Sequence, residues 1–127
     1  LAPQWLQGCR LRACWFEPSF HKYAGELCAG VQIHVEDGAY DPAAFRPWRL
    51  MALAFKALRR LRPDYALWRD FPYEYEVERL AIDVINGSEL LRQWVDDPEA
   101  TPDDLEALAG TDETAWIAEQ EAVMLYR

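Results

Sequence analysis

The segment from Pro47 to Arg62 constrains the fold most strongly, because its apolar residues recur with the period of an α-helix. Proline suits the first position of a helix, and Pro63 ends the pattern. The apolar positions form one wide stripe, made by Trp48, Met51, Phe55 and Leu58 and backed by Leu50, Leu53, Ala54, Ala57 and Leu61. The basic residues are expected outside this stripe, at Lys56, Arg59, Arg60 and Arg62. We therefore predict one long helix that packs on a sheet.

Two segments before this helix alternate between apolar and polar residues, as strands do. In Cys9 to Phe16, one side carries Leu11, Ala13 and Trp15 and the other carries Arg10, Arg12 and Cys14. In Val31 to Val35, the three aliphatic residues are expected on the core face, with Gln32 and His34 on the opposite face. A third, short strand is predicted from Leu80 to Ile85.

The last third of the chain carries the signals of short helices. Ser88 is expected to cap a helix to about Val95. Thr101-Pro102-Asp103-Asp104 is a strong helix start, and Gly110 is expected to end that helix. A final helix is expected from Asp112 towards Tyr126, with one side buried at Trp116, Ile117, Gln120, Val123 and Met124. The fold class is therefore α+β: a small sheet packed by a long helix and followed by short C-terminal helices, in one domain over residues 1–127.

Charge is unevenly distributed along the chain. The net charge is −9, with +3 on residues 1–68 and −12 on residues 69–127. A strongly acidic half repels a phosphate backbone, so nucleic acid is not expected as a partner. No apolar run reaches the roughly 18 residues of a membrane-spanning helix. The sequence starts at Leu1 without a signal-peptide pattern, which predicts a fragment of a longer protein.

Cysteine and glycine spacing gives no sign of a bound metal or cofactor. Cys9, Cys14 and Cys28 are odd in number, so at least one is unpaired within the chain, and their spacing matches no common zinc pattern. The glycines form no phosphate-binding loop. We expect neither a metal site nor a cofactor.

Polar residues gather between the two alternating segments. A loop that carries His21, Lys22, Tyr23 and Glu26 leads directly into the segment with Gln32 and His34. Residues two apart in a strand point to the same side, so Gln32 and His34 share a face. Loops that a sheet positions often bind ligands. The alternative is that Gln32 and His34 only satisfy neighbouring backbone groups.

Several motifs in this region resemble those of the NamZ-like exo-β-N-acetylmuramidases. The resemblance is carried by Lys22-Tyr23-Ala24-Gly25-Glu26, by Cys28 and by Gly30-Val31-Gln32-Ile33-His34-Val35. It continues through Phe45-Arg46-Pro47, Pro72-Tyr73-Glu74-Tyr75-Glu76 and Ile82-Asp83-Val84-Ile85-Asn86-Gly87-Ser88, and so covers nearly the whole chain. Departures are small: His21 replaces a more usual serine, Ala29 a glycine, and Glu36 stands before Asp37 where threonine is common.

The resemblance implies a bacterial two-domain enzyme of which this chain is the C-terminal domain. A Rossmann-like N-terminal domain, absent here, would carry the principal catalytic carboxylates, and the active site would lie in the cleft between the domains. Such hydrolases release N-acetylmuramic acid from the non-reducing ends of peptidoglycan chains, a step of cell-wall recycling. The family further implies an extracytoplasmic location. This fragment is expected to be inactive alone.

Within that family, the polar loop and strand are expected to bind the sugar. A glycosidase commonly uses two carboxyl groups about 5–9.5 Å apart, and Glu26 is the one acid inside the signature loop. Glu26 is expected to orient the sugar or to hold His34 or Lys22, and is only a weak candidate for the general acid.

Muramic acid also carries a lactyl carboxylate, which needs donors or positive charge in a partly dry cleft. The candidates for that anion are Lys22, His34 and His21, while Gln32 and Tyr23 are candidates for the acetamido or hydroxyl groups.

Two other functions stay open from the sequence. One is a non-catalytic module that binds cell-wall glycan or stabilises its partner domain. The other, less favoured, is a thiol or metal hydrolase built from Cys28, His34 and Glu26. A domain that lines a cleft should also expose an apolar patch to its partner. The aromatic residues of segment 65–75 and Trp5 are candidates for that patch or for ordinary core.

Overall fold

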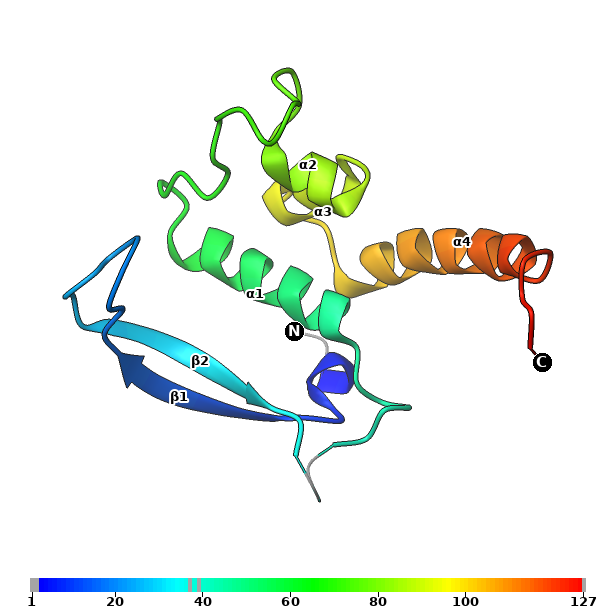
Figure 1. Ribbon diagram of the computed structural model, residues 1–127, viewed down its shortest axis with the longest axis horizontal. Coiled ribbons are helices and arrows are strands. Elements are labelled where there is room, and N and C mark those ends of the chain that lie inside the picture. Colours follow the sequence, from blue (N-terminus) through cyan, green and yellow to red (C-terminus); the bar gives the residue numbers. More distant parts are fainter. Residues whose placement is uncertain (1–2, 37, 39, 127) are drawn as a thin grey trace. The chain divides into compact units, whose positions relative to one another are not determined.

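The computed structural model describes residues 3–36, 38 and 40–126. Its elements are a 3₁₀ helix η1 (Pro3–Leu6), strands β1 (Arg10–Phe16) and β2 (Cys28–His34), and helices α1 (Pro47–Leu61), α2 (Ala81–Asn86), α3 (Leu90–Asp96) and α4 (Pro102–Gln120) (Figure 1). The chain divides into two compact units, residues 2–51 and residues 52–127, with α1 crossing the boundary. The predicted α+β class is confirmed.

The first unit is built on an antiparallel hairpin of β1 and β2. The register pairs Arg10 with His34 at the open end and Phe16 with Cys28 at the end closed by loop 17–27. The side chains of both faces are mostly exposed. The prediction of a core face on β2 is therefore wrong: Val31 is 65% exposed and Val35 51%. A two-stranded hairpin has too little sheet surface to enclose a core of its own.

Gly8 fixes the base of the hairpin. Its φ is +74°, and a Cβ at this position would lie 2.5 Å from the backbone nitrogen of Phe45 and 2.6 Å from the carbonyl oxygen of Asp41. The Gly8 carbonyl accepts a hydrogen bond from the Asp41 N–H at 3.2 Å. Position 8 therefore requires glycine both for its backbone angle and for the space.

Helix α1 forms as predicted, but with a different buried side. Lys56, expected outside, is only 2% exposed, whereas Trp48, Met51 and Leu58 of the predicted stripe are 39–49% exposed. In the second unit, the Lys56 ammonium donates to the carbonyl oxygen of Trp94 at 2.6 Å and to that of Asp97. It also lies 4.7 Å from the centroid of the Trp94 ring. The lysine therefore binds the C-terminal end of α3, where unpaired carbonyls attract a cation.

Helix α2 replaces the strand predicted from Leu80 to Ile85. Asp83 on this helix is 3% exposed, and both of its oxygens accept hydrogen bonds from Nε of Arg92 at 2.9 and 3.0 Å. The helical conformation directs the buried carboxylate of Asp83 towards α3. Gly87, with a φ of +84°, ends helix α2. Helix α3 begins at Leu90, later than expected, and Ser88 instead accepts a hydrogen bond from Asn86.

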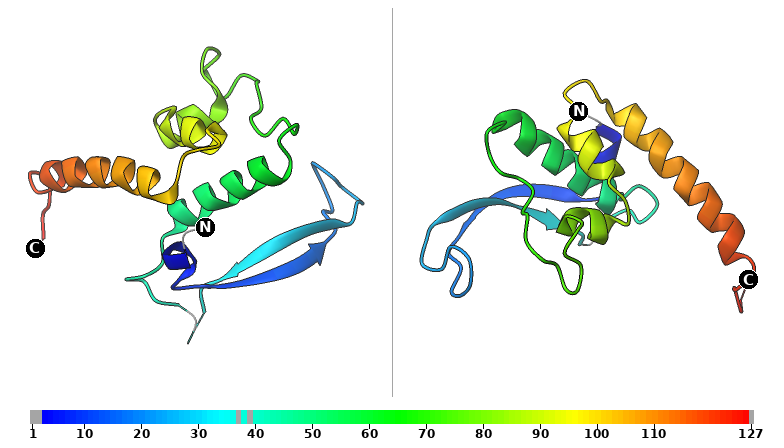
Figure 2. Two further views of the ribbon diagram at one scale, coloured as in Figure 1. Left: turned by 180° about the vertical axis from the view of Figure 1, so that it is seen from behind. Right: turned by 90° about the horizontal axis from the view of Figure 1, so that it is seen from above.

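Helix α4 is one helix of 19 residues rather than two short ones. Thr101 caps it with the reciprocal bonds to Asp104 that its sequence predicts. It continues through Gly110, where the threonine hydroxyls of the following turn donate to helix carbonyls. Its C-terminal half extends away from α2 and α3 (Figures 1 and 2). The predicted burial of Trp116, Ile117, Val123 and Met124 is consequently wrong, since they are 52–72% exposed.

Candidate functional site

The β-hairpin places two arginines beside two polar residues of the family-like motif. Residues that pair directly across an antiparallel ladder point to the same face. Arg10 is opposite His34, and Arg12 is opposite Gln32. This polar face, defined by Arg10, Arg12, Gln32 and His34, carries no carboxylate within the two strands.

Hydrogen bonding orients one guanidinium of the polar face. Nη2 of Arg12 donates to Oε1 of Gln32 at 2.5 Å, which leaves the other N–H groups of Arg12 available. Within the described part of the chain, the Arg10 guanidinium has no hydrogen-bond or ion-pair partner. Two guanidinium groups on alternate residues of one strand suit an oxyanion, because each offers N–H donors in a planar fork.

His34 adds an unmet polar atom to this face. Its Nδ1 lies 3.4 Å from Oε1 of Glu36. Its Nε2 is buried and has no hydrogen-bond partner among the described residues. A buried ring nitrogen without a partner is costly, so a ligand hydroxyl or carboxylate that reached it would be stabilised.

The other half of the same face is apolar. Farther along the hairpin it continues through Cys14, opposite Gly30, to Phe16, opposite Cys28. The Phe16 ring lies over Gly30: a Cβ at position 30 would be 2.8 Å from the Cε1 atom of Phe16. Phe16 is 49% exposed. The face therefore offers cationic donors at one end and, about 20 Å away, an aromatic surface at the other, so the two ends suit different parts of one ligand chain.

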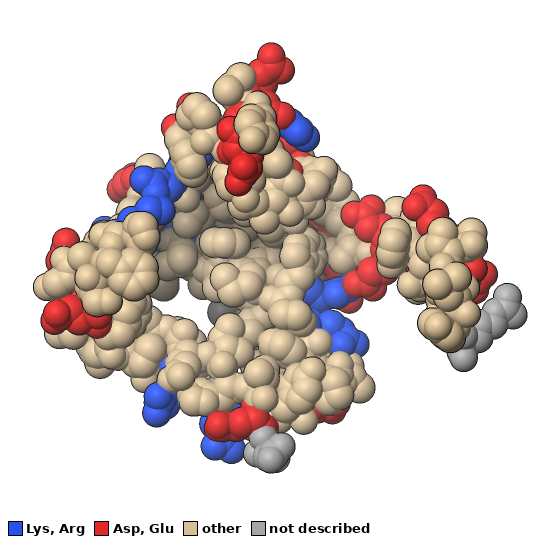
Figure 3. Space-filling view, in the orientation of Figure 1, with Lys and Arg blue, Asp and Glu red and all other residues tan. Residues whose placement is uncertain are grey.

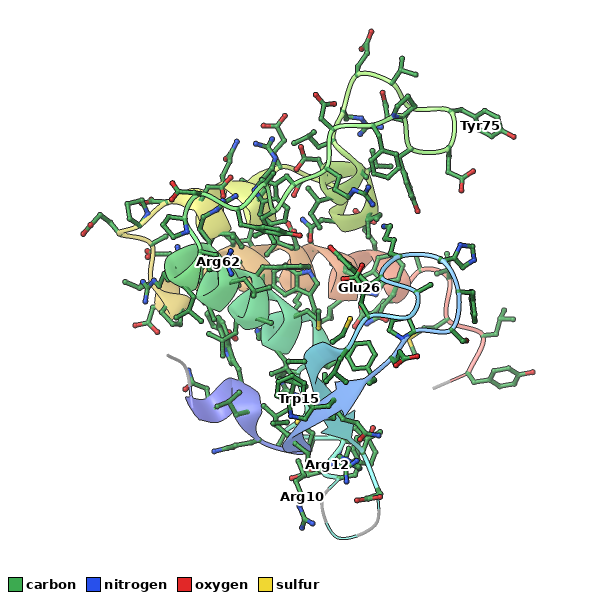
Figure 4. The ribbon with its side chains drawn as sticks, turned by 90° about the vertical axis from the view of Figure 1, so that its left-hand side faces the viewer. Arg10, Arg12, Trp15, Glu26, Arg62 and Tyr75 are labelled. Atoms are coloured by element: carbon green, nitrogen blue, oxygen red, sulfur yellow. The ribbon has the colours of Figure 1, made fainter. Side chains whose placement is uncertain are left out.

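The polar loop residues lie at the far end of the hairpin from this cationic group. Glu26 precedes β2 by two residues, whereas His34 ends it. Six strand steps separate Cys28 from His34, about 20 Å at 3.3 Å per residue. Figure 4 shows Glu26 in the loop and Arg10 and Arg12 towards the opposite end. Of the two partners expected for Glu26, His34 is therefore too far away to be held by it.

Loop 17–27 forms a separate surface. His21 and Tyr23 adopt positive φ angles of 62° and 59°, and Gly25 donates to the Pro18 carbonyl at 2.9 Å. Phe20, His21 and Lys22 line an open hollow at this end. The structure thus divides the predicted sugar-binding residues into a loop group, which holds Lys22, Tyr23 and Glu26, and a strand group, which holds Gln32 and His34.

The sequence interpretation missed Arg10 and Arg12 as site residues. Their alternation was visible, but their place beside Gln32 and His34 depends on the register of two strands separated by eleven residues. Pairing the two alternating segments as an antiparallel hairpin would have placed Arg10 and Arg12 beside His34 and Gln32.

Other chemistry finds little support in the described ranges. No group of three His, Cys, Asp or Glu side chains there could hold a metal ion. Cys28 is at the opposite end of β2 from His34, which separates the members of the proposed thiol or metal hydrolase site. A second hollow, between α3 and α4, is acidic at Asp97, Glu99 and Asp104 and so repels an anionic ligand. No described helix is long and apolar enough to span a membrane.

Comparison with known proteins gives one match. Residues 1–126 match a family model described as "Exo-beta-N-acetylmuramidase NamZ, C-terminal". No curated protein and no solved structure matches the chain.

Proposed function

The chain belongs to the family of C-terminal domains of the exo-β-N-acetylmuramidase NamZ, and from this premise we propose that it lines the sugar-binding cleft of such an enzyme. The family implies a hydrolase with a peptidoglycan-related function and a partner N-terminal domain. The role proposed for this chain is to bind the N-acetylmuramic acid residue at the non-reducing end. The catalytic carboxylates belong to the N-terminal domain in this proposal.

The observation that carries the proposal is the polar face of the hairpin. The lactyl group of muramic acid is a carboxylate, and its transfer from water into a cleft is unfavourable unless donors or cations replace the water. Arg12, oriented by Gln32, and Arg10, which has no partner among the described residues, provide both, in a chain whose net charge is −9. The buried Nε2 of His34 is suited to bind a neighbouring sugar hydroxyl.

The loop group is assigned to a different part of the glycan. A length of about 20 Å exceeds one sugar residue, so Lys22, Tyr23 and Glu26 are proposed to contact a sugar farther along the chain. Glu26 is not proposed as the general acid, because nothing brings it to the polar face.

The test uses the full-length enzyme and two substrates that differ only in the lactyl group: the natural carboxylate and its neutral carboxamide. Loss of one charge-assisted hydrogen bond costs about 1.5–3 kcal/mol, roughly 10- to 150-fold in affinity. Arg12→Gln is expected to raise KM for the carboxylate at least about tenfold and to remove the preference over the carboxamide. Lys22→Gln, a matched loss of charge at the other end of the hairpin, should keep that preference.

Two outcomes would contradict the proposal. If Arg12→Gln discriminates between the substrates as the wild type does, the polar face does not bind the lactyl carboxylate. If the wild-type enzyme hydrolyses neither substrate, the muramidase assignment itself fails.

A further inference from the structure

A tight turn in the second unit presents one tyrosine almost completely to solvent. Tyr73 and Glu76 exchange two backbone hydrogen bonds, of 3.0 and 2.9 Å, and Glu74 and Tyr75 form the tip between them. The Tyr75 side chain is 98% exposed, and Figure 4 shows it pointing outwards from the end of the segment. A large aromatic side chain gains nothing for this chain's own stability in that position.

The turn is nevertheless held in one conformation. Oε1 of Glu76 accepts hydrogen bonds from the backbone N–H groups of Glu78 at 2.8 Å and Arg79 at 3.3 Å. Oε2 of Glu76 accepts from Nε of Arg79 at 2.8 Å. These bonds lower the pKa of Glu76 to about 2, so its carboxylate stays ionised at neutral pH and keeps these bonds. The tip is therefore pre-organised, although it packs against no core.

The tip also carries backbone strain. Glu74 has a φ of +56°, which residues other than glycine seldom adopt. Such conformations persist where surrounding bonds enforce them, and they gather at binding sites. An exposed tyrosine on a strained turn that hydrogen bonds already hold in place has the properties of a binding anchor. The turn is ordered before it binds, so it loses little conformational entropy on binding.

The shape of the turn favours a protein as the ligand. Small molecules and sugars bind in concave sites, whereas this turn protrudes beyond α2 (Figures 1 and 2). A protruding aromatic residue instead enters a pocket of its partner, as tyrosines at the centre of protein interfaces do.

Charge around the tip indicates the chemistry of that pocket. Asp70, Glu74 and Glu78 surround Tyr75 in sequence, and their carboxylates have no partner among the described residues. Figure 3 shows acidic side chains at the end of this segment. Unpaired carboxylates around an apolar anchor match a pocket with an apolar interior and a rim of lysine or arginine.

We infer that Tyr75 anchors this domain to the N-terminal domain of the same enzyme, by entering an apolar pocket with a basic rim. The inference rests on the proposed function, because the family describes a C-terminal domain and so identifies the partner as the N-terminal part of one protein. The acidic rim of the turn sets the orientation of the contact, and the Tyr75 ring supplies its buried area.

Photo-crosslinking in the full-length enzyme tests the inference directly. p-Benzoylphenylalanine replaces Tyr75 in one sample and Tyr126, which is 87% exposed, in a control. Position 75 is expected to crosslink within the same polypeptide, to N-terminal peptides that contain lysine or arginine. Crosslinks confined to this domain, to a second copy or to added glycan would overturn the inference, as would a yield no higher than at position 126.

Hydrogen–deuterium exchange gives a second readout. Tyr75→Ser is expected to speed exchange in the crosslinked N-terminal peptides at least about tenfold, the effect of losing an interface anchor. Tyr126→Ser should leave those peptides unchanged, and equal exchange in both variants would reject the anchor. Hydrolysis of muramyl substrates is measured on the same samples. An enzyme that is inactive but still crosslinks from position 75 would contradict the proposed function and still support the interface.

Discussion

The buried ammonium of Lys56 should be one of the main stabilising groups of the second unit. It donates to two carbonyl oxygens at the end of α3 and lies over the Trp94 ring. Lys56→Met keeps the length and the apolar part of the side chain but removes all donors. Hydrogen bonds from a charged group contribute about 1.5–3 kcal/mol each, and relief of the ammonium's desolvation offsets part of the loss. Because Lys56→Met also leaves the carbonyls of Trp94 and Asp97 without their donor, at about 1–3 kcal/mol each, we expect unfolding to become easier by about 2–4 kcal/mol.

Urea unfolding followed by tryptophan fluorescence measures this effect. With a slope of about 2 kcal/mol/M, the midpoint should fall by about 1–2 M. Arg60→Met is the matched control, because Arg60 lies on the exposed side of the same helix and its loss should change stability by less than about 0.5 kcal/mol. The reasoning is refuted if Lys56→Met unfolds within about 0.5 kcal/mol of the wild type.

The pH dependence of the same residue has a defined sign. Burial lowers the pKa of Lys56 below 10.5, and repulsion from Arg60 lowers it further. Between the folded and unfolded pKa values the unfolded chain binds more protons, so the free energy of unfolding rises with pH towards 10.5. Lys56→Met should remove this part of the slope, and an unchanged slope would contradict the assignment.

Three further contacts can be tested by substitution and by pH. Asp83→Ala leaves Arg92 without its carboxylate partner and should lower the free energy of unfolding in urea by about 2–4 kcal/mol. The double variant Asp83→Leu with Arg92→Met leaves no unpaired charge and should recover most of this loss. Equal losses in the single and double variants would contradict this. Thr101→Ala should cost about 1 kcal/mol and lower the helical circular dichroism of α4, and no change would show that the capping box contributes nothing. The Glu76 carboxyl should titrate near pH 2 by carbon-13 NMR, so its stabilisation is complete above about pH 4.5 and is lost as pH falls towards 2. Arg79→Ala should raise this midpoint only partly, because the hydrogen bond from the Glu78 backbone N–H lowers the pKa of Glu76 more than the Arg79 side chain does. A full return of the midpoint to 4.5 would show that Arg79 is the larger cause.

Local signals in the sequence predicted the elements whose causes are local. Pro47 and Pro63 delimit α1, and Thr101 with Asp104 starts α4, because proline geometry and capping act within one helical turn. The predicted helix end at Gly110 is wrong, because a glycine inside a helix costs only about 1 kcal/mol and does not stop the helix.

Features that depend on distant residues could not be predicted in this way. Segment 80–85 fits a strand or a helix equally, and only the pairing of Asp83 with Arg92 shows why the helix forms. Lys56 is buried because α3 offers it two carbonyls, 38 and 41 residues away. For the same reason the motif predicted Gln32 and His34 as site residues but missed the arginines that the hairpin register adds.

The hairpin's positive charges depend on a residue that has no side chain. Gly8 lies two positions before Arg10, where a positive φ and the backbone of Asp41 and Phe45 leave no room for a Cβ. A larger residue there would push the strand away from Asp41 and Phe45 and carry both guanidinium groups with it. An enzyme altered only at position 8 would keep every ionisable group that the proposed site uses and still present those groups in the wrong place.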